Sequence, residues 1–177
     1  FSSRRRHTRS LCDGVQTCAL PIYIFAFSCM ESDHDTDWTN HILLPKIENE
    51  LGLSMCLQER DFEVGSPIAD EIVNAISTSR KILLVVSKHF VQSEWCEFAT
   101  QMALLRDMDS VLCVIIDDLG HTIYTMPKSL RSLLSCNRYI EWPEYNEERQ
   151  RKFWFLLKKF LKQRLMPRAR KRQIVVV

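Results

Sequence analysis

The sequence predicts an α/β domain in which helices cover both faces of a parallel sheet. Short runs of apolar, β-prone residues recur along the chain, and the segments between them carry apolar residues at helical spacing. The runs are continuously apolar instead of alternating, which is typical of strands that are covered on both faces. Strands that alternate with helices form βαβ units with right-handed crossovers, so we expect one parallel sheet.

The first predicted strand is Tyr23–Ser28, a short aromatic run. After an acidic stretch, apolar residues recur at helical spacing from Trp38 to Leu51, and Gly52 is a suitable C-cap for this helix. Leu53–Leu57 is the second predicted strand.

A polar loop and a second helix are predicted next. Ser66 is expected to cap this helix, with Pro67 at its first position and Asp70 near its positive end. The stripe that would face the core consists of Ile68, Ile72 and Ile76.

Two strongly apolar runs, Lys81–Ser87 and Val111–Ile116, are the third and fourth predicted strands. Between them, a helix is expected to begin at Ser93. The large apolar side chains of this helix are expected to form its inner face: Trp95, Phe98, Met102 and Leu105.

The last part of the chain predicts a helical turn around Leu130–Leu134, a brief fifth strand at Arg138–Glu141 and a final helix over Glu147–Leu165 that ends before Pro167. The basic residues of the final helix are expected to form a solvated face. We therefore expect a flavodoxin-like three-layer sandwich over residues 23–166, with a five-stranded parallel sheet flanked by helices.

Charge divides the chain into three parts. Residues 1–22 hold four Arg and one Asp (+3), residues 167–177 hold three Arg and one Lys (+4), and the remaining 16 basic and 21 acidic residues leave 23–166 at −5. A mildly acidic domain does not fit a nucleic-acid reader, which concentrates basic residues on its folded face. We expect solvated, disordered tails, with an anionic membrane surface as the alternative. The first tail also resembles translated sequencing-adapter sequence, so the alternative to a disordered tail is that residues 1–22 are non-native.

Seven cysteines are present, an odd number without a C-x-x-C pair. This pattern indicates reduced thiols in a cytosolic compartment. No stretch reaches the roughly 20 apolar residues that span a bilayer, so this fragment is not expected to insert into a membrane. The histidines lack the spacing of metal ligands, and neither a metal nor a cofactor is expected.

The most distinctive segment lies in the loop between the second strand and the second helix. It carries more charge and apolar surface than a connector needs, and loops on a rigid scaffold often carry binding function. We expect Phe62 and Val64 to present apolar contacts to a partner. The alternative is that Arg60 and Asp61 pair locally and brace the loop while Phe62 folds back onto the sheet. The predicted binding loop consists of Arg60, Asp61, Phe62, Glu63, Val64, Gly65 and Ser66.

With this loop in place, the chain resembles the Toll/interleukin-1 receptor (TIR) homology domain. Tyr23–Cys29 is similar to the family's first box, an aromatic strand that ends in Ser. Arg60–Gly65 is similar to the second box, the BB loop, which is usually Arg-Asp-x-x-Pro-Gly. Phe153-Trp154 is similar to the third box, while Ser93–Cys96 and Tyr139–Pro143 are similar to the Toll-like receptor branch.

The resemblance implies a cytoplasmic innate-immune signalling module without enzymatic activity. Such a module binds other TIR domains, both copies of itself and adaptors, and recruits adaptors through the BB loop. In a full-length protein it would be tethered to a membrane receptor that clusters it. The residues expected to anchor the fold are Tyr23, Ser28, Trp95, Cys96, Phe153 and Trp154.

Three departures from the family pattern bear on function. Val64 replaces the BB-loop Pro, which leaves the choice of partner open, and Ile24 stands where an Asp is common. Some TIR domains are NAD glycohydrolases that use the Glu of Trp-Cys-x-x-Glu, but Ala99 occupies that position here. Glu97 is two residues earlier, about 200° around a helix, and cannot take over from the same face. An NAD glycohydrolase is therefore the disfavoured alternative.

Overall fold

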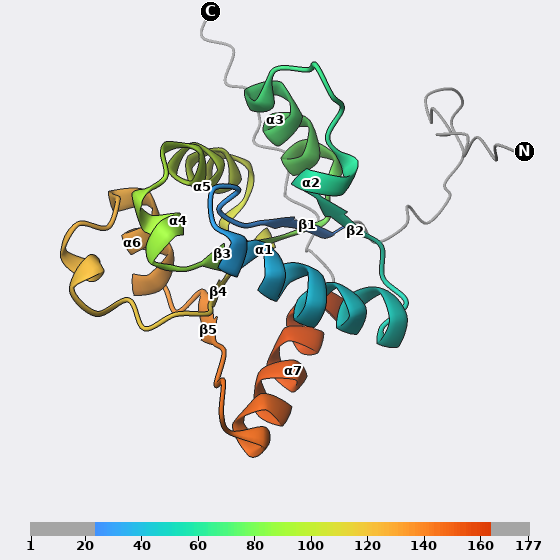
Figure 1. The fold of residues 1–177 in the computed structure, drawn as a ribbon, viewed down its shortest axis with the longest axis vertical. Helices are drawn as coiled ribbons and strands as arrows, with labels where there is room; N and C mark the ends of the chain where they lie inside the picture. The colour runs from blue at the N-terminus through green and yellow to red at the C-terminus, as the bar shows by residue number, and fades with distance from the viewer. Residues whose placement is uncertain (1–23, 164–177) are drawn as a thin grey trace, which may run out of the picture.

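Five parallel strands form the centre of the molecule in the computed structural model, which describes residues 24–163 (Figure 1). The strands are β1 (Ile24–Phe27), β2 (Met55–Leu57), β3 (Lys81–Val86), β4 (Val111–Ile115) and β5 (Tyr139–Glu141). Their order across the sheet is β2-β1-β3-β4-β5, and every neighbouring pair is parallel. This is the strand order of flavodoxin-like folds, so the predicted fold class is confirmed.

The central strands are buried on both faces because helices cover the sheet on each side. Every residue of β1 and β3 is buried. Successive side chains of a strand point to opposite faces, and accordingly Phe25 and Phe27 join one buried cluster while Ile24 and Ala26 join the other. The molecule therefore has three layers, as Figure 1 shows.

One face of the sheet is covered by four helices, which pack against the cluster that contains Phe25. They are α3 (Ile68–Thr78), α4 (Lys88–Gln92), α5 (Glu94–Arg106) and α6 (Lys128–Ser135). The other face is covered by α1 (Asp33–Trp38), by the π-helical turns η1 (Thr39–Leu43) and η2 (Lys46–Glu50) that continue it, and by α7 (Glu147–Lys162). The remaining short elements are α2 (Gln58–Asp61) and the 3₁₀ turns η3 (Met108–Ser110) and η4 (Gly120–Tyr124).

The first helix begins earlier than its apolar pattern predicted. Ser32 caps α1 by accepting a hydrogen bond from the backbone N–H of Asp35, so the acidic stretch is helical. Gly52 follows the last turn with a φ of +63°, a conformation that glycine adopts without a steric penalty, as its predicted role requires. The five-residue helix α4 was not predicted, because one turn is too short to show a period.

The predicted inner face of α5 is wrong for Trp95 and Leu105, whereas Phe98 and Met102 are half-buried against the core cluster, as expected. Small side chains face the sheet, namely Cys96, Ala99, Thr100 and Ala103. Trp95 is 38% exposed and Leu105 is 75% exposed, so Trp95 is not the core anchor that we expected. The large residues lie at the margin of the helix, where Trp95 meets Phe98 edge-to-face at 6.2 Å between ring centroids. Small residues allow the helix to lie close to the sheet, a choice that hydrophobicity alone does not predict.

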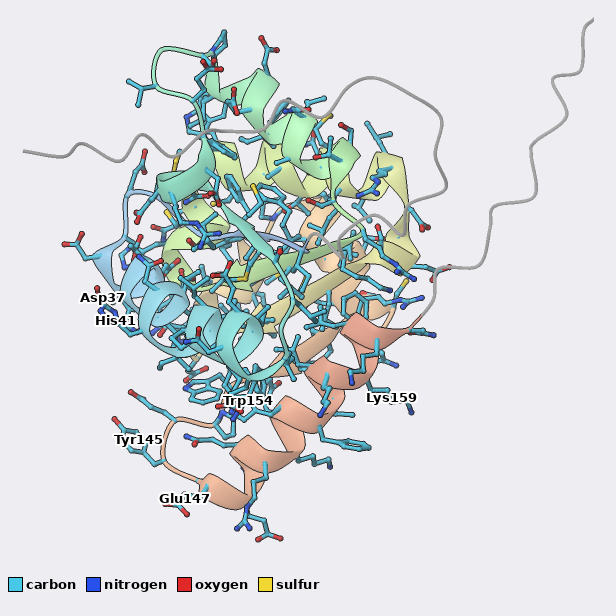
Figure 2. The ribbon with its side chains drawn as sticks, turned by 90° about the vertical axis from the view of Figure 1, so that its right-hand side faces the viewer. Asp37, His41, Tyr145, Glu147, Trp154 and Lys159 are labelled. Carbon is cyan, nitrogen blue, oxygen red and sulfur yellow. The ribbon has the colours of Figure 1, made fainter. Side chains whose placement is uncertain are left out.

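An aromatic cluster joins α7 to the sheet and to α1. Trp142, at the end of β5, meets Phe153 at 5.1 Å and Trp154 at 5.5 Å between centroids, both edge-on. Trp38 contacts Trp142 in the same way at 5.6 Å. Phe153 is buried and Trp154 half-buried, with the ammonium group of Lys46 over the Trp154 ring. Figure 2 shows Trp154 on the side of α7 that faces α1.

Candidate functional site

The predicted binding segment follows β2 at the carboxyl edge of the sheet. Its first residues form one helical turn, α2, so Arg60 and Asp61 lie in a helix and not in an open loop. We call Gln58–Phe62 the braced turn and Glu63–Ser66 the exposed tip. The sequence did not predict this division, because a four-residue helix carries no periodic signal.

Arg60 fixes the braced turn to η2 and β2. Its guanidinium donates to both carboxylate oxygens of Glu48 at 3.1 and 3.2 Å and also contacts the carbonyl oxygen of Met55. Its Nε donates to Asp61 at 3.1 Å. Hydrogen bonds to Glu48 and then Asp61 raise the pKa of Arg60 above its usual value. Arg60 is therefore occupied within the domain, as the bracing alternative requires.

Asp61 closes the same turn through the backbone. Its Oδ2 accepts a hydrogen bond from the backbone N–H of Leu57 at 2.8 Å. An ionised acceptor makes this bond stronger than one between neutral groups. Asp61 thus serves the shape of the segment, and its carboxylate is already used by Leu57 and Arg60.

Phe62 folds back onto the sheet, as the bracing alternative expected. Its ring stacks on Phe25 of β1 with centroids 6.1 Å apart and an interplanar angle of 21°. The side chain is half-buried against the cluster under α3. An aromatic ring gains more from burial there than it would from display on the surface.

The start of the braced turn is tied to two other elements. The side-chain amide of Gln58 donates to the carbonyl oxygen of Ser28 at 2.9 Å, and both residues are buried. The carboxylate of Glu59 accepts from Thr36 at 3.0 Å and from Asn40 at 3.4 Å. The braced turn is therefore fixed to the end of β1 and to the α1–η1 helix.

The exposed tip is a tight turn that carries one fully exposed apolar side chain. The backbone N–H of Ser66 donates to the carbonyl of Glu63 at 3.2 Å, and Gly65 has a φ of +96°. A positive φ at the third position fits a type II turn, where Pro is favoured at the second position. Val64 occupies that second position and is 100% exposed.

Ser66 does not cap the following helix. Pro67 is the N-cap residue of α3, and no side chain bonds to the first turn of that helix. The predicted cap is wrong because the chain enters α3 one residue later than expected, after the turn is complete. Glu63 and Gly65 are exposed, whereas Ser66 is half-buried.

A buried carboxylate lies where the strand order reverses, between the carboxyl ends of β1 and β3. Asp35 is 0% exposed and accepts hydrogen bonds from Ser87 at 2.5 Å and Ser32 at 3.1 Å, with His34 at 3.4 Å. Flavodoxin-like folds bind ligands in the crevice at this switch point. Here Asp35 ties the loops that follow β1 and β3 to each other, a role that nothing in the sequence distinguished from that of Asp33 or Asp37.

Cys96 is buried beside Cys29, from the loop after β1. The hydrogen bond between the two thiols lowers the pKa of Cys29 to about 7. The same contact, with burial, raises the pKa of Cys96. Ala99 lies one turn further along α5 and is 0% exposed within the same cluster, while Glu97 accepts a hydrogen bond from Gln101 at 3.0 Å.

Some predictions fall outside the described residues, namely the anchor Tyr23 and the two tails at 1–22 and 167–177. Within residues 24–163, every helix is too short or too polar to cross a bilayer. In the same range, no group of three or more potential metal ligands is found.

Comparison with known proteins finds a TIR domain family model and Toll-like receptors. The family model described as "TIR domain" matches residues 22–173. Toll-like receptor 6 from Bos taurus is 34% identical over 145 residues, covering 78% of this chain and 18% of the receptor. Toll-like receptor 2 type-2 from Gallus gallus is 37% identical over 137 residues, covering 74% of this chain and 17% of the receptor. The chain thus spans less than a fifth of these relatives.

Solved structures agree on the fold. The TIR domain of a Toll-related receptor from Hydra magnipapillata has a TM-score of 0.63 at 18% identity, covering 79% of this chain and 98% of that one. A metazoan TIR-STING receptor from C. gigas has a TM-score of 0.61 at 24% identity, covering 84% of this chain and 41% of that one.

Proposed function

Because the chain belongs to the TIR domain family, we propose that it is an innate-immune signalling module that acts through contacts between TIR domains. In this proposal it associates with copies of itself and recruits adaptor TIR domains on the cytoplasmic side of a membrane receptor. The curated relatives that it matches are Toll-like receptors, of which it corresponds to a small part.

One observation carries the proposal: the fully exposed Val64 follows the braced turn, which is held in place by contacts within the domain. Val64 is 100% exposed, while the braced turn beneath it is held by Glu48, Leu57 and Phe25. A loop that is ordered before binding loses little conformational entropy when a partner arrives. The contact supplied by Val64 is small, so each pairwise association is expected to be weak.

Weak contacts become effective when a receptor holds several copies together. Linking binding sites can raise the overall avidity by about 10²–10⁴-fold without any new contact. We therefore expect the 177-residue chain, fused to a dimeric coiled coil, to bind a densely immobilised adaptor TIR domain at least tenfold better than a monomeric control. Equal capture by the dimeric and monomeric fusions would contradict clustering as the mechanism.

We further propose that the domain is a scaffold and not an NAD glycohydrolase. Ala99 stands at the position of the family's catalytic Glu and is buried in the core. Asp35 and Ser87 occupy the switch point of the sheet with a hydrogen bond to each other.

The purified 177-residue chain incubated with NAD tests this second proposal. We expect nicotinamide release at the rate of a heat-denatured sample. Release above that control, retained through further purification, would overturn the assignment as a scaffold.

A further inference from the structure

The outer side of α7 combines unpaired positive charge with exposed apolar surface. Phe155 is 66% exposed and Leu156 is 38% exposed. The exposed basic residues of the helix around them are Arg151, Lys152, Lys158, Lys159 and Lys162. Figure 2 shows Lys159 on the side of α7 away from Trp154.

The packing of α7 on the sheet does not depend on Phe155. The core-facing stripe of α7 is complete and consists of Phe153, Leu157, Phe160 and Leu161, all buried. Phe155 belongs to a second stripe on a different side. Residues four, seven and eleven apart share a helix face, so Arg151, Phe155, Lys158 and Lys162 lie in one row.

The charges in this row are free to meet an external partner. Among residues 24–163, no carboxylate lies within ion-pair distance of the five basic side chains of this face. The sequence after α7 adds further positive charge, with Arg164, Arg168, Arg170, Lys171 and Arg172. Phe155 and Leu156 are adjacent and both exposed, so this surface carries an apolar patch bordered by basic side chains, which is typical of an interaction site.

We propose that this face of α7 rests on an anionic lipid bilayer. The basic side chains would lie at the level of the headgroups, while Phe155 enters the boundary of the acyl chains. Amphipathic helices that bind in the membrane interface combine basic residues with exposed aromatic or aliphatic ones in this way. The proposal does not rest on the function proposed above.

The chemistry favours a bilayer over an acidic protein partner. A protein interface usually places its aromatic anchor in a well-packed pocket of the partner, surrounded by contacts that exclude water. Phe155 instead lies beside Leu156 on an outward helix face, in a row with the long flexible cationic side chains of Arg151, Lys158 and Lys162. Long cationic side chains adapt to mobile headgroups without a fixed geometry.

Sedimentation of the 177-residue chain with lipid vesicles tests the proposal. We expect binding to vesicles of phosphatidylcholine with phosphatidylserine, little binding to phosphatidylcholine alone, and a decrease as salt rises. The double variant Lys158→Glu, Lys162→Glu is expected to lower the partition coefficient about tenfold or more. Phe155→Ser, which removes no charge, is expected to lower it several-fold.

A matched control separates this face from the general charge of the chain. Lys88→Glu with Lys128→Glu makes the same change in net charge on α4 and α6, which lie on the opposite face of the sheet. All variants keep both basic tails, and thermal unfolding confirms that each is folded. An equal decrease in the two double variants, no effect of Phe155→Ser, or no binding to anionic vesicles would each overturn the proposal.

Discussion

The braced turn and the exposed tip are neighbours in the sequence, yet the domain holds the first in place and presents the second to solvent. In the braced turn, Arg60, Asp61 and Phe62 all have partners within the domain. In the exposed tip, Val64 has none of its surface covered. Arg60, Asp61 and Phe62 thus set the shape of this segment, whereas Val64 stays accessible for the recognition proposed above.

The largest expected effect is on the braced turn. Phe62→Ala removes a half-buried ring that stacks on Phe25. A buried Phe→Ala change costs about 3–5 kcal/mol, so we expect a loss of about 2 kcal/mol for this half-buried site. Urea unfolding measures it, and Phe62→Leu should recover most of the loss. An unchanged unfolding midpoint for Phe62→Ala would show that the ring contributes nothing to the fold.

The next prediction compares the stability lost when each of two carboxylates of this segment, Asp61 and Glu63, is removed. Asp61→Ala leaves the N–H of Leu57 without its acceptor and Arg60 without one partner. We expect a loss of about 1 kcal/mol in unfolding free energy. Glu63→Ala, in the exposed tip, should change stability by less than about 0.5 kcal/mol. The comparison fails if the two variants have the same stability.

A smaller effect is expected at Gly65, whose φ of +96° shapes the exposed tip. A Cβ at this position meets no atom within 4 Å, so only the backbone conformation opposes a side chain. We expect Gly65→Ala to cost about 1 kcal/mol or less, because L-residues disfavour a positive φ. Thermal unfolding detects this shift, and a more stable variant would mean that the turn does not need the left-handed conformation.

The smallest effect is expected from Val64→Pro. The second position of a type II turn has the φ that proline fixes, and the N–H of Val64 makes no backbone hydrogen bond within the described residues. We expect a gain of about 0.5 kcal/mol, because proline restricts the unfolded chain. Thermal unfolding against the wild type measures the gain. A clear loss of stability would show that the tip has a different turn geometry.

The sequence predicted the layers better than the site. Long apolar runs such as Lys81–Ser87 identify buried strands directly, because a strand covered on both faces has no polar side. The burial of Asp35 depends on Ser87, which is 52 residues away, and no local pattern encodes that distance. Tertiary packing likewise determines the position of the Phe62 ring. From the sequence alone, a residue in this loop could pack on the sheet or contact a partner, and the structure shows the ring stacked on Phe25.

The inner face of α5 shows the same limit within a regular element. Hydrophobicity favoured Trp95 and Leu105 for the core, whereas the close approach of helix and sheet selects Ala99 and Ala103. The helix itself was predicted correctly and its inner face only in part, because side-chain volume, and not polarity alone, decides which residues fit between two layers.

Capture of an adaptor TIR domain by the Val64→Asp variant tests the central claim most directly. Leu105→Asp is the matched control, since Leu105 is also largely exposed but lies near the end of α5, before β4 begins. We predict that Val64→Asp lowers co-precipitation about tenfold or more with an unchanged melting curve, while Leu105→Asp binds like the wild type. If Val64→Asp binds as well as the wild type, the exposed tip is not the recognition surface.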